Sequence, residues 1–413
     1  MRKLMVSIML AALVVTVAGG LFASGAPEEE QTPDKLVYLT PPWGAPSDAV
    51  VAAFEEETGI ELEVATVDIE TSRNRVLTAA AGRSNPADVI FVSNDTYASF
   101  QSAGAIAPLE DLAPQEMLNR VAGVDQFRIN DQLWAVPLYQ QMVMLDYDTT
   151  ALDAIGMTAA EIETWDDLEA AMVQLKEEGV YEYPYAAGVR PWTWYLTALS
   201  SGSDLFDENN EPVFDDPSDP GYDAFLQVLG FFEQGLISPE RLSSANPHPS
   251  FWAGQAAFHQ AWQGGLGLAN DPEASEVAPN ADYLLLPNEH YTWLLPAGLT
   301  VSAYTDYPEA AMQLIQFFTE DAMQRHLFDA NGLFPANVDV FSELGDAGEI
   351  EGFDVMNEQA QYIKSIPYDQ PWYIEWETEA EQTMLRVARG DQNAEEAIED
   401  MADHARELKA EYE

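Results

Sequence analysis

Apolar segments and helix-forming segments alternate along residues 36–92, and this alternation constrains the fold more than any other feature of the chain. Three segments have the apolar content and the period expected of β-strands: residues 36–39, 60–67 and 88–92. Between them, Ser47 can cap a helix that Gly59 ends, and residues 73–81 have helical spacing. Strands separated by helices favour a parallel sheet with helices on both faces. We therefore predict the α/β class.

Later segments continue this pattern. Thr164, followed three residues later by Asp167, matches a helix-initiating capping box. Residues 222–233 and 308–319 have the spacing of amphipathic helices, and a last helix is predicted to begin near Asn393. The length of the chain favours two domains, and no repeat or long low-complexity linker separates them. We expect two lobes joined by several short crossings.

The N-terminus has the organisation of a secretory signal peptide. Arg2 and Lys3 precede an apolar run over residues 4–18, and small residues follow. This run is shorter than the ~20 apolar residues of a membrane-spanning helix, although an N-terminal membrane anchor is the alternative interpretation. We predict a cleaved signal peptide over residues 1–25 and a disordered polar leader over residues 26–35.

The chain contains no cysteine. Its composition therefore excludes disulfides, thiolate metal sites and cysteine nucleophiles. It also lacks the cysteine to which many exported proteins attach a lipid after the signal. We expect a soluble protein in the periplasm of a double-membraned bacterium.

The chain is strongly acidic, with 71 acidic and 17 basic residues and a formal net charge of −54. A hydrophobic content of 47% still allows a large core, so the charge does not imply disorder. Self-repulsion destabilises such a compact state unless salt screens it. The chain is either an unusually acidic exported protein or, as we favour, one with a halophilic surface. Nucleic acid and anionic membranes are excluded as partners because no basic patch can neutralise phosphates.

Seven short segments occur in an order and spacing known from one protein family: residues 54–60, 85–91, 104–109, 131–137, 251–258, 331–335 and 389–398. For example, Phe251-Trp-Ala-Gly-Gln-Ala-Ala-Phe258 is similar to the family's Phe-x-x-Gly-x-Ala-Ala-Met element. With the stretch from Asn130 to Leu168, these segments resemble family 1 of the extracellular solute-binding proteins of ABC transporters, the maltose-binding-protein type. One departure is Gln132, which stands where the family hairpin Asp-Gly-Lys has glycine.

The resemblance implies a two-lobed Venus-flytrap fold of the class II periplasmic-binding-protein type, each lobe a mostly parallel sheet flanked by helices. Lobe 1 would comprise residues 36–140 and 298–334, and lobe 2 residues 141–297 and 335–413. The lobes would close by a hinge motion around a sugar, most simply an oligosaccharide. The closed form would be recognised by an ABC permease in the inner membrane. The resemblance implies a monomeric receptor that is not an enzyme and needs no cofactor.

Aromatic faces and directed polar groups are the expected ligand contacts, because sugar rings have apolar faces and many hydroxyls. The family positions imply eight ligand-binding residues: Trp43, Asp95, Tyr97, Gln141, Arg190, Trp192, Trp262 and Trp376. The alternative for each tryptophan is packing in the core. Arg190 departs from the maltose binders, which have an acidic residue there. Its guanidinium could bind a uronic-acid carboxylate, donate to neutral hydroxyls or stack on a ring.

Other chemistry has little support in the sequence. The five histidines lack metal-ligand spacing, so no metal site is expected. The glycine-rich residues 264–267 lack a dinucleotide or phosphate-loop pattern and are interpreted as a loop beside Trp262. The acidic residues 204–216 lack the ligand alternation of a calcium loop and are interpreted as a surface hairpin. With so many acids, a carboxylate pair is no sign of a glycosidase.

Two alternatives to a sugar receptor stay open. The same fold could enclose a quaternary-ammonium osmolyte or a polyamine in an aromatic, acidic cleft. An exported carbohydrate-active enzyme is the other alternative, although the sequence has no Gly-x-Ser-x-Gly elbow or other catalytic motif.

Overall fold

The computed structural model describes residues 32–94, 96–188, 191–242 and 246–412. The predicted signal peptide and the first six residues of the predicted leader lie outside this part. The first strand begins at Lys35, so the predicted leader extends one residue too far. In the described part, no helix combines the length and the apolar character needed to cross a membrane.

The first of two main sheets contains six strands in the order β13-β6-β12-β3-β1-β2. Its strands are β1 Lys35–Thr40, β2 Glu61–Thr66, β3 Val89–Ser93, β6 Val136–Gln140, β12 Ala297–Val301 and β13 Phe334–Pro335. As predicted from the strand–helix alternation, β1 pairs in parallel with β2 and β3. However, β12 pairs antiparallel with β3 and β6, and β13 pairs antiparallel with β6. The expectation of a mostly parallel sheet is therefore wrong here, because β6, β12 and β13 do not follow β-α-β crossovers.

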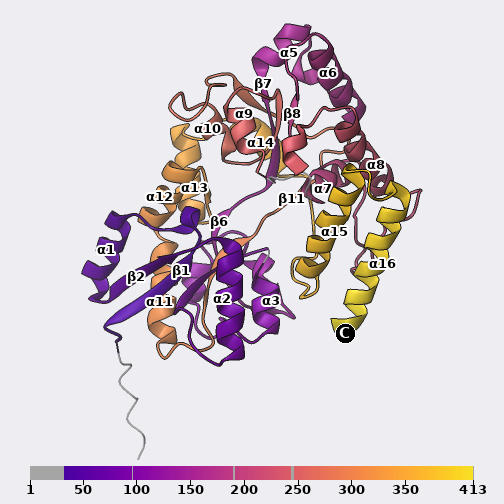
Figure 1. Cartoon of the computed structure of the whole chain (residues 1–413). Helices are drawn as coiled ribbons and strands as arrows, with labels where there is room; N and C mark the ends of the chain where they lie inside the picture. Colours follow the sequence, from indigo (N-terminus) through magenta and orange to yellow (C-terminus); the bar gives the residue numbers. More distant parts are fainter. Residues whose placement is uncertain (1–31, 95, 189–190, 243–245, 413) are drawn as a thin grey trace, which may run out of the picture. The chain divides into compact units, whose positions relative to one another are not determined.

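Capping residues explain where the first helices begin and end. Helix α1, Asp48–Thr58, begins after Ser47, whose side chain accepts a hydrogen bond from the first turn, and ends at Gly59 with a φ of 74°. Helix α2, Ile69–Ala81, begins four residues before the predicted start, because the Asp68 side chain caps its first turn. Three further helices accompany this sheet in Figure 1: α3 Tyr97–Ser102, α11 Pro308–Phe318 and α12 Asp321–Asn331.

Asp88 explains one of the family-like segments. Its buried carboxylate accepts hydrogen bonds from the Val37 backbone N–H (2.8 Å), the Asn85 side chain (2.8 Å) and the Thr305 hydroxyl (2.6 Å). These partners come from β1, from the turn before β3 and from the segment after β12. Asp88 therefore joins three separate segments of the first sheet, which is a structural role.

A short hairpin precedes β6. Strands β4 Arg128–Ile129 and β5 Gln132–Leu133 flank Asn130 and Asp131, which have φ values of 52° and 63°. Asparagine and aspartate tolerate this left-handed conformation better than most residues. The turn therefore does not require glycine at Gln132, the position at which the sequence departs from the family pattern.

The second main sheet contains four strands in the order β10-β7-β9-β8. Its strands are β7 Val143–Asp148, β8 Tyr185–Ala186, β9 Phe258–Trp262 and β10 Ala281–Leu284. β7 pairs antiparallel with β9 and β10, and only β8 pairs in parallel with β9. The prediction of a mostly parallel sheet is wrong here as well.

Strand β6 contains a proline. It runs through Pro137 to Gln140. Pro137 lies opposite Gly298, beside a register shift between β6 and β12. A proline is tolerated at such an irregularity because its missing N–H removes no regular ladder bond.

The short helix α4, Gln115–Leu118, precedes β4. The other α-helices follow β7 or β12 along the chain: α5 Thr149–Ile155, α6 Trp165–Glu177, α7 Pro191–Ser200, α8 Pro220–Glu233, α9 His248–Trp252, α10 Gly265–Ala269, α13 Val338–Ala347, α14 Phe353–Gln359, α15 Tyr373–Ala388 and α16 Ala394–Tyr412. The predicted capping box at α6 is confirmed, since Thr164 and Asp167 each bond the other's backbone N–H. The glycine-rich residues 264–267 were predicted as a loop, but residues 265–267 belong to α10.

Aromatic rings form the core between α7, α15 and the hairpin over residues 204–216. The Trp194 and Phe214 rings meet edge to face with centroids 4.9 Å apart, as do those of Phe206 and Trp376. The acidic hairpin is held against α16 by two ion pairs, Arg406 with Asp215 and Lys409 with Glu211. No metal-binding group of acidic or histidine side chains occurs in the described part of the chain.

Candidate ligand-binding site

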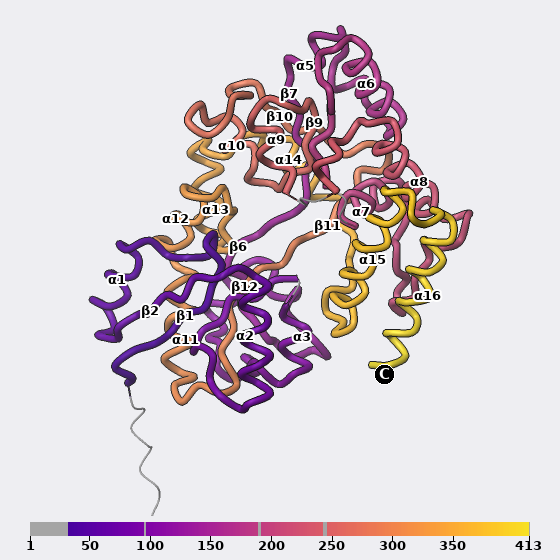
Figure 2. The backbone as a smooth tube through the Cα atoms, in the orientation of Figure 1, coloured from indigo at the N-terminus to yellow at the C-terminus, as the bar shows by residue number. Residues whose placement is uncertain are grey.

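Two connections between the main sheets lie side by side (Figures 1 and 2). One joins β6 to β7 through Gln141, and the other leads from β11, Thr292–Trp293, to β12. The Leu295 N–H donates to the Gln141 carbonyl (2.8 Å), and Met142 pairs with Leu294 in an isolated bridge. The predicted ligand residue Gln141 is therefore located where the chain passes between the sheets, with its side chain only partly buried.

Trp43 lies at the end of β1, in the short 3₁₀ helix Pro42–Gly44. Its side chain is 39% exposed. The indole N–H donates to the Tyr139 hydroxyl of β6 (3.1 Å), and the Trp43 carbonyl accepts from the Asn331 side chain (3.3 Å). An indole face held at one edge while partly open to solvent is suited to stacking on a ligand ring.

Trp192 and Trp262 come from the second sheet and its helices. Trp192, in the first turn of α7, donates to the Glu377 carboxylate (3.1 Å) and meets the Trp293 ring edge to face, with centroids 6.2 Å apart. Trp262 is the last residue of β9, and both tryptophans are partly buried. The next residue, Gln263, donates to the Gln140 carbonyl at the end of β6 (3.1 Å). The end of β9 is therefore bonded to the end of β6.

Two glycine backbones touch beside Trp262. A Cβ atom on Gly264 would lie 1.4 Å from the carbonyl oxygen of Gly332, and a Cβ on Gly332 would lie 2.3 Å from the Gly264 carbonyl oxygen. Gly264 follows β9, whereas Gly332 ends α12 just before β13 of the first sheet. Only glycine at both positions permits this approach of a segment of one sheet to a segment of the other.

The structure places two other predicted residues in the core. Tyr97 is 1% exposed and packs edge to face on Phe127, and Trp376 is fully buried, with its indole N–H donating to the Met401 carbonyl (2.8 Å). Because both rings are buried, we leave Tyr97 and Trp376 out of the proposed site. Asp95 and Arg190 lie outside the described residues.

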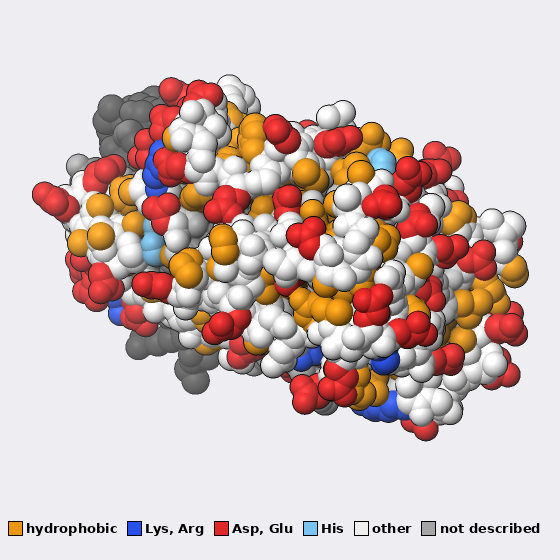
Figure 3. All heavy atoms as spheres, turned by 90° about the horizontal axis from the view of Figure 1, so that it is seen from above, with side chains coloured by type: hydrophobic (Ala, Val, Ile, Leu, Met, Phe, Trp, Pro, Cys, Tyr) orange, Lys and Arg blue, Asp and Glu red, His pale blue; other side chains and the backbone are white. Residues whose placement is uncertain are grey.

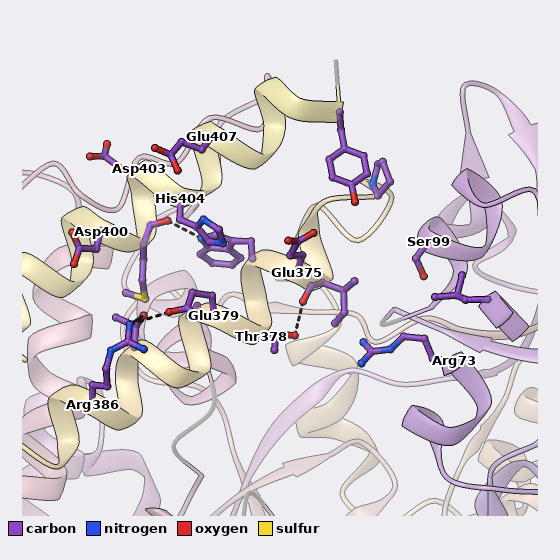
Figure 4. A pocket seen from close by; sticks show the side chains of 18 residues that line it. Arg73, Ser99, Glu375, Thr378, Glu379, Arg386, Asp400, Asp403, His404 and Glu407 are labelled. Carbon is purple, nitrogen blue, oxygen red and sulfur yellow. Dashed lines mark hydrogen bonds and ion pairs between the residues drawn. The ribbon is translucent and has the colours of Figure 1, made fainter. Parts of the chain in front are cut away.

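A pocket of about 970 Å³ lies between α2 and α3 on one side and α15 and α16 on the other. In Figure 4, Arg73 and Ser99 lie across it from Glu375 and Thr378. Of the predicted ligand residues that the structure describes, Trp376 alone lines this pocket, and its ring is buried. The sequence did not single out this pocket, because acidic residues on helices carry little information in a chain with 71 of them.

A buried polar chain was also missed by the sequence analysis. Asp146 Oδ2 lies 3.3 Å from Nδ1 of His259, and His259 Nε2 lies 2.8 Å from Nδ1 of His248. Burial raises the pKa of Asp146 well above its usual range, and the charge of Asp282 adds to this. Burial lowers the pKa of both His248 and His259 to about 3. The two histidines are eleven positions apart, a spacing that matches no recognisable motif.

Acidic side chains far outnumber basic ones on the face of the protein shown in Figure 3, and they are spread over the whole of this face. Several ion pairs in the described part are well exposed, such as Lys35 with Glu63 and Arg120 with Asp339. Exposed pairs of this kind contribute little to stability, so they do not offset the repulsion among the remaining carboxylates.

Comparison with known proteins identifies the class to which this fold and site belong. Residues 39–325 match the bacterial extracellular solute-binding protein family, and the chain therefore belongs to that family. It is a non-enzymatic binding receptor of the ABC-transporter type, as predicted. An uncharacterised ABC-transporter extracellular-binding protein of Pyrococcus horikoshii is 22% identical over 362 residues, 80% of this chain and 82% of the relative.

Two solved structures show the same fold. MalE3 of T. maritima with bound maltose has a TM-score of 0.78 at 19% identity, covering 91% of this chain and 100% of that one. Lmo0181 from Listeria monocytogenes in complex with cycloalternan has a TM-score of 0.77 at 20% identity, covering 92% and 100%. The predicted α/β periplasmic-binding-protein fold is thereby confirmed, with mixed sheets in place of the mostly parallel ones.

The buried histidines predict a pH dependence of stability. Between pH 6.5 and 4.5 the unfolded chain gains protons on imidazoles that stay neutral in the folded protein, so the free energy of unfolding falls as the pH is lowered. Asp146 acts in the opposite sense, because the folded protein keeps its proton where the unfolded chain loses it. His248→Asn should therefore reduce the dependence by up to about 1.4 kcal/mol per pH unit.

Urea unfolding at several pH values measures this slope. The control is His290→Asn, which removes a histidine outside the chain of Asp146, His259 and His248. An unchanged slope in the His248→Asn variant would show that the His248 imidazole is not kept neutral by the fold.

Proposed function

We propose that this protein is an exported receptor of an ABC importer that captures a carbohydrate, most simply an oligosaccharide, between two lobes. The observation that carries the proposal is a hydrogen bond between the two sheets: Gln263, the residue after Trp262, donates to the carbonyl of Gln140. Gln140 follows Tyr139, whose hydroxyl holds the Trp43 indole. The two solved neighbours contain maltose and cycloalternan, which supports a carbohydrate as the ligand class.

The proposed site combines apolar faces with directed hydrogen bonds. Trp43, Trp192 and Trp262 would supply the faces on which sugar rings pack, and Gln141 would supply donor and acceptor groups. Asp95 and Arg190 stay predictions from the family positions. An arginine in a place that is acidic in maltose binders favours a ligand other than a plain maltodextrin, because a guanidinium matches carboxylate and hydroxyl acceptors.

We propose that the lobes comprise residues 36–140 with 298–334 and residues 141–297 with 335–413, and that they close around the ligand. The contact between Gly264 and Gly332 supports closure, because it joins segments of the two sheets next to Trp262. Hinge motion would separate these glycines in an open form and bring them together when the ligand is bound.

The cellular setting is part of the same proposal. Removal of residues 1–25 would release a monomeric receptor into the periplasm, where its closed form would bind the inner-membrane permease. The acidic surface would be adapted to concentrated salt. This setting would account for the predicted export signal and for the charge of −54 in a single scheme.

The ligand class is tested by a thermal-shift screen of the protein without residues 1–25, in molar salt. A compound that binds the folded form raises the melting temperature by mass action, by an amount that grows with its concentration relative to Kd. We expect neutral oligosaccharides such as maltotriose, or uronides such as glucuronate, to raise it. Betaine and spermidine are included because an aromatic, acidic cleft could enclose them.

The outcomes separate the possibilities. A shift with one carbohydrate class supports the receptor proposal, and a preference for uronides would assign Arg190 to a carboxylate. A shift with betaine or spermidine alone would contradict a sugar ligand while leaving the family intact. Turnover of a polysaccharide by the purified protein would contradict a binding role.

Closure is tested by Gly264→Ala. The backbone of Gly264 (φ −120°, ψ 0°) is accessible to alanine, so the main cost of the new Cβ is its clash with Gly332. We expect ligand affinity to fall by about tenfold or more, which corresponds to about 1.4 kcal/mol, while the unliganded protein stays folded. Calorimetry measures the affinity, and small-angle scattering measures the compaction on binding.

The matched control is Gly267→Ala, since a Cβ at Gly267 would meet no atom within 4 Å. Equal affinity of the Gly264→Ala variant and the wild type would show that the glycine contact does not belong to the bound state.

The salt proposal predicts that the free energy of unfolding by urea rises from dilute buffer to molar sodium chloride. Screening shortens the range of repulsion among surface carboxylates to about 3 Å at 1 M salt. Sucrose at the same osmolality controls for solute exclusion, which stabilises proteins without screening charge. Equal stability in dilute buffer and molar salt would contradict a halophilic surface.

A further inference from the structure

A chain of three side chains leads from the interior of the second sheet to the tryptophan at the end of β9. Asp146 of β7 and His259 of β9 are both fully buried. His248, the first residue of α9, is only partly buried and completes the chain. The two hydrogen-bond distances are 3.3 Å between Asp146 and His259 and 2.8 Å between the histidines.

His248 lies within the aromatic group that flanks the proposed ligand site. Its ring stacks on Trp252, with centroids 5.7 Å apart and planes at 27°, and meets Trp262 edge to face at 4.8 Å. The turn at Gly254 (φ 64°) reverses the chain between α9 and β9 and so returns the end of β9 to the start of α9. The imidazole is fixed in position by these two rings and by its bond to His259.

One ring nitrogen of His248, Nε2, is available for a further hydrogen bond. Nδ1 is used in the bond to His259. Nε2 makes no hydrogen bond in the described part of the chain, and it is not among the buried polar atoms that are sealed from solvent without a partner. An imidazole nitrogen that is positioned but unused, beside a tryptophan predicted to stack on the ligand, is available for a ligand hydroxyl or carboxylate.

The protonation state of Asp146 decides whether Nε2 of His248 is a hydrogen-bond donor or an acceptor. A protonated Asp146 donates to Nδ1 of His259, so His259 donates from Nε2 to Nδ1 of His248, and His248 then carries its proton on Nε2. An ionised Asp146 accepts from His259, and every proton in the chain moves to the opposite nitrogen, which leaves Nε2 of His248 as an acceptor. Neutral imidazole has one donor and one acceptor, so no other arrangement satisfies both hydrogen bonds.

The surroundings favour the protonated form of Asp146. Its Oδ1 has no hydrogen-bond partner in the described part of the chain, which a buried carboxylate would tolerate poorly. Burial and the charge of Asp282 raise its pKa, and Tyr283 lies near enough to be affected by its charge. At His248, burial is the main factor that disfavours the imidazolium. The charges of His259 and Arg241 add to this effect. All three side chains are then neutral near pH 7.

We propose that His248 is a ligand-contacting residue that presents Nε2–H as a donor to an acceptor oxygen of a carbohydrate stacked on Trp262. His259 and Asp146 act as positioning residues that hold His248 in this tautomer. The inference rests on the proposed sugar-binding function and adds a specificity-determining donor to it. A ligand whose oxygen at this place can only accept, such as a ring oxygen, a glycosidic oxygen or a carboxylate, is favoured over one that must donate.

The first test compares His248→Asn with His248→Gln, by calorimetry, using maltotriose or whichever carbohydrate of the panel raises the melting temperature most. The asparagine amide can replace Nδ1 and keep the bond to His259, but it cannot reach the position of Nε2. The glutamine amide can replace Nε2. We expect affinity to fall by about tenfold in the asparagine variant and by less in the glutamine variant, as for loss of one directed hydrogen bond.

His290→Asn is the matched control, and its affinity should equal that of the wild type. Equal affinity of the wild type and the His248→Asn variant would overturn the proposal. A larger loss with glutamine than with asparagine would do the same, because it would mean that the bond to His259, rather than Nε2, matters for binding.

The second test addresses the positioning residues. The hydrogen bonds between Asp146, His259 and His248 reverse direction when Asp146 loses its proton. The ligand affinity of the wild type should therefore decline as the pH rises through the raised pKa of Asp146. Asp146→Asn keeps a donor towards His259 and cannot ionise, so its affinity should not show this decline. A decline of the same size in the Asp146→Asn variant would show that another group is responsible and would overturn the assigned role of Asp146.

The third measurement needs no ligand. Long-range ¹H–¹⁵N spectra of the histidine rings distinguish the two neutral tautomers, and both His248 and His259 should carry their protons on Nε2 at pH 7. Protons on Nδ1 of both rings would overturn the donor assignment even if a sugar binds. Binding by no carbohydrate of the panel would instead overturn the proposed function, and the spectra would still report whether the chain of hydrogen bonds exists.

Discussion

Two backbone contacts between neighbouring connections underlie the arrangement of the whole site. The Leu295 N–H donates to the Gln141 carbonyl, and Met142 pairs with Leu294. Because these contacts set where β6 leaves the first sheet and where β12 returns to it, they also set which strand ends meet. The side chains available for a ligand, Trp262 among them, follow from that crossing. A site assembled in this way depends on pairing between segments about 150 positions apart rather than on any local motif.

The free-energy cost of removing a charge from water governs both the polar interior of the second sheet and the acidic exterior of the protein. Removing charge from water is expensive unless the group is paired or neutral, and a chain with 71 acidic residues has few cations with which to pair them. Carboxylates therefore crowd the surface. Asp88 is buried but accepts three hydrogen bonds, and Asp146 is buried at the end of the two-histidine chain, where neutrality is the less costly state.

Local features of the fold were predictable because they depend on neighbouring residues. Ser47 caps α1 and Thr164 caps α6 as predicted, since a cap needs only a side-chain oxygen next to the free N–H groups of a helix. The start of α2 was misplaced because Asp68 was not recognised as its cap. The antiparallel pairing of β12 was missed for a different reason: its partners, β3 and β6, are distant in the sequence, and the strand itself carries no mark of direction.

The same division applies to the candidate site. By itself, the sequence determined the family, the alternation of strands and helices, the capped helix ends and the aromatic positions worth testing, because these depend on the order and type of neighbouring residues. Only the tertiary structure decided that Trp43 is open while Tyr97 and Trp376 lie in the core, since burial depends on which distant segments pack against a side chain. It also joined Asp146 to His259, a contact across 113 positions that no spacing rule anticipates, and through His259 to His248.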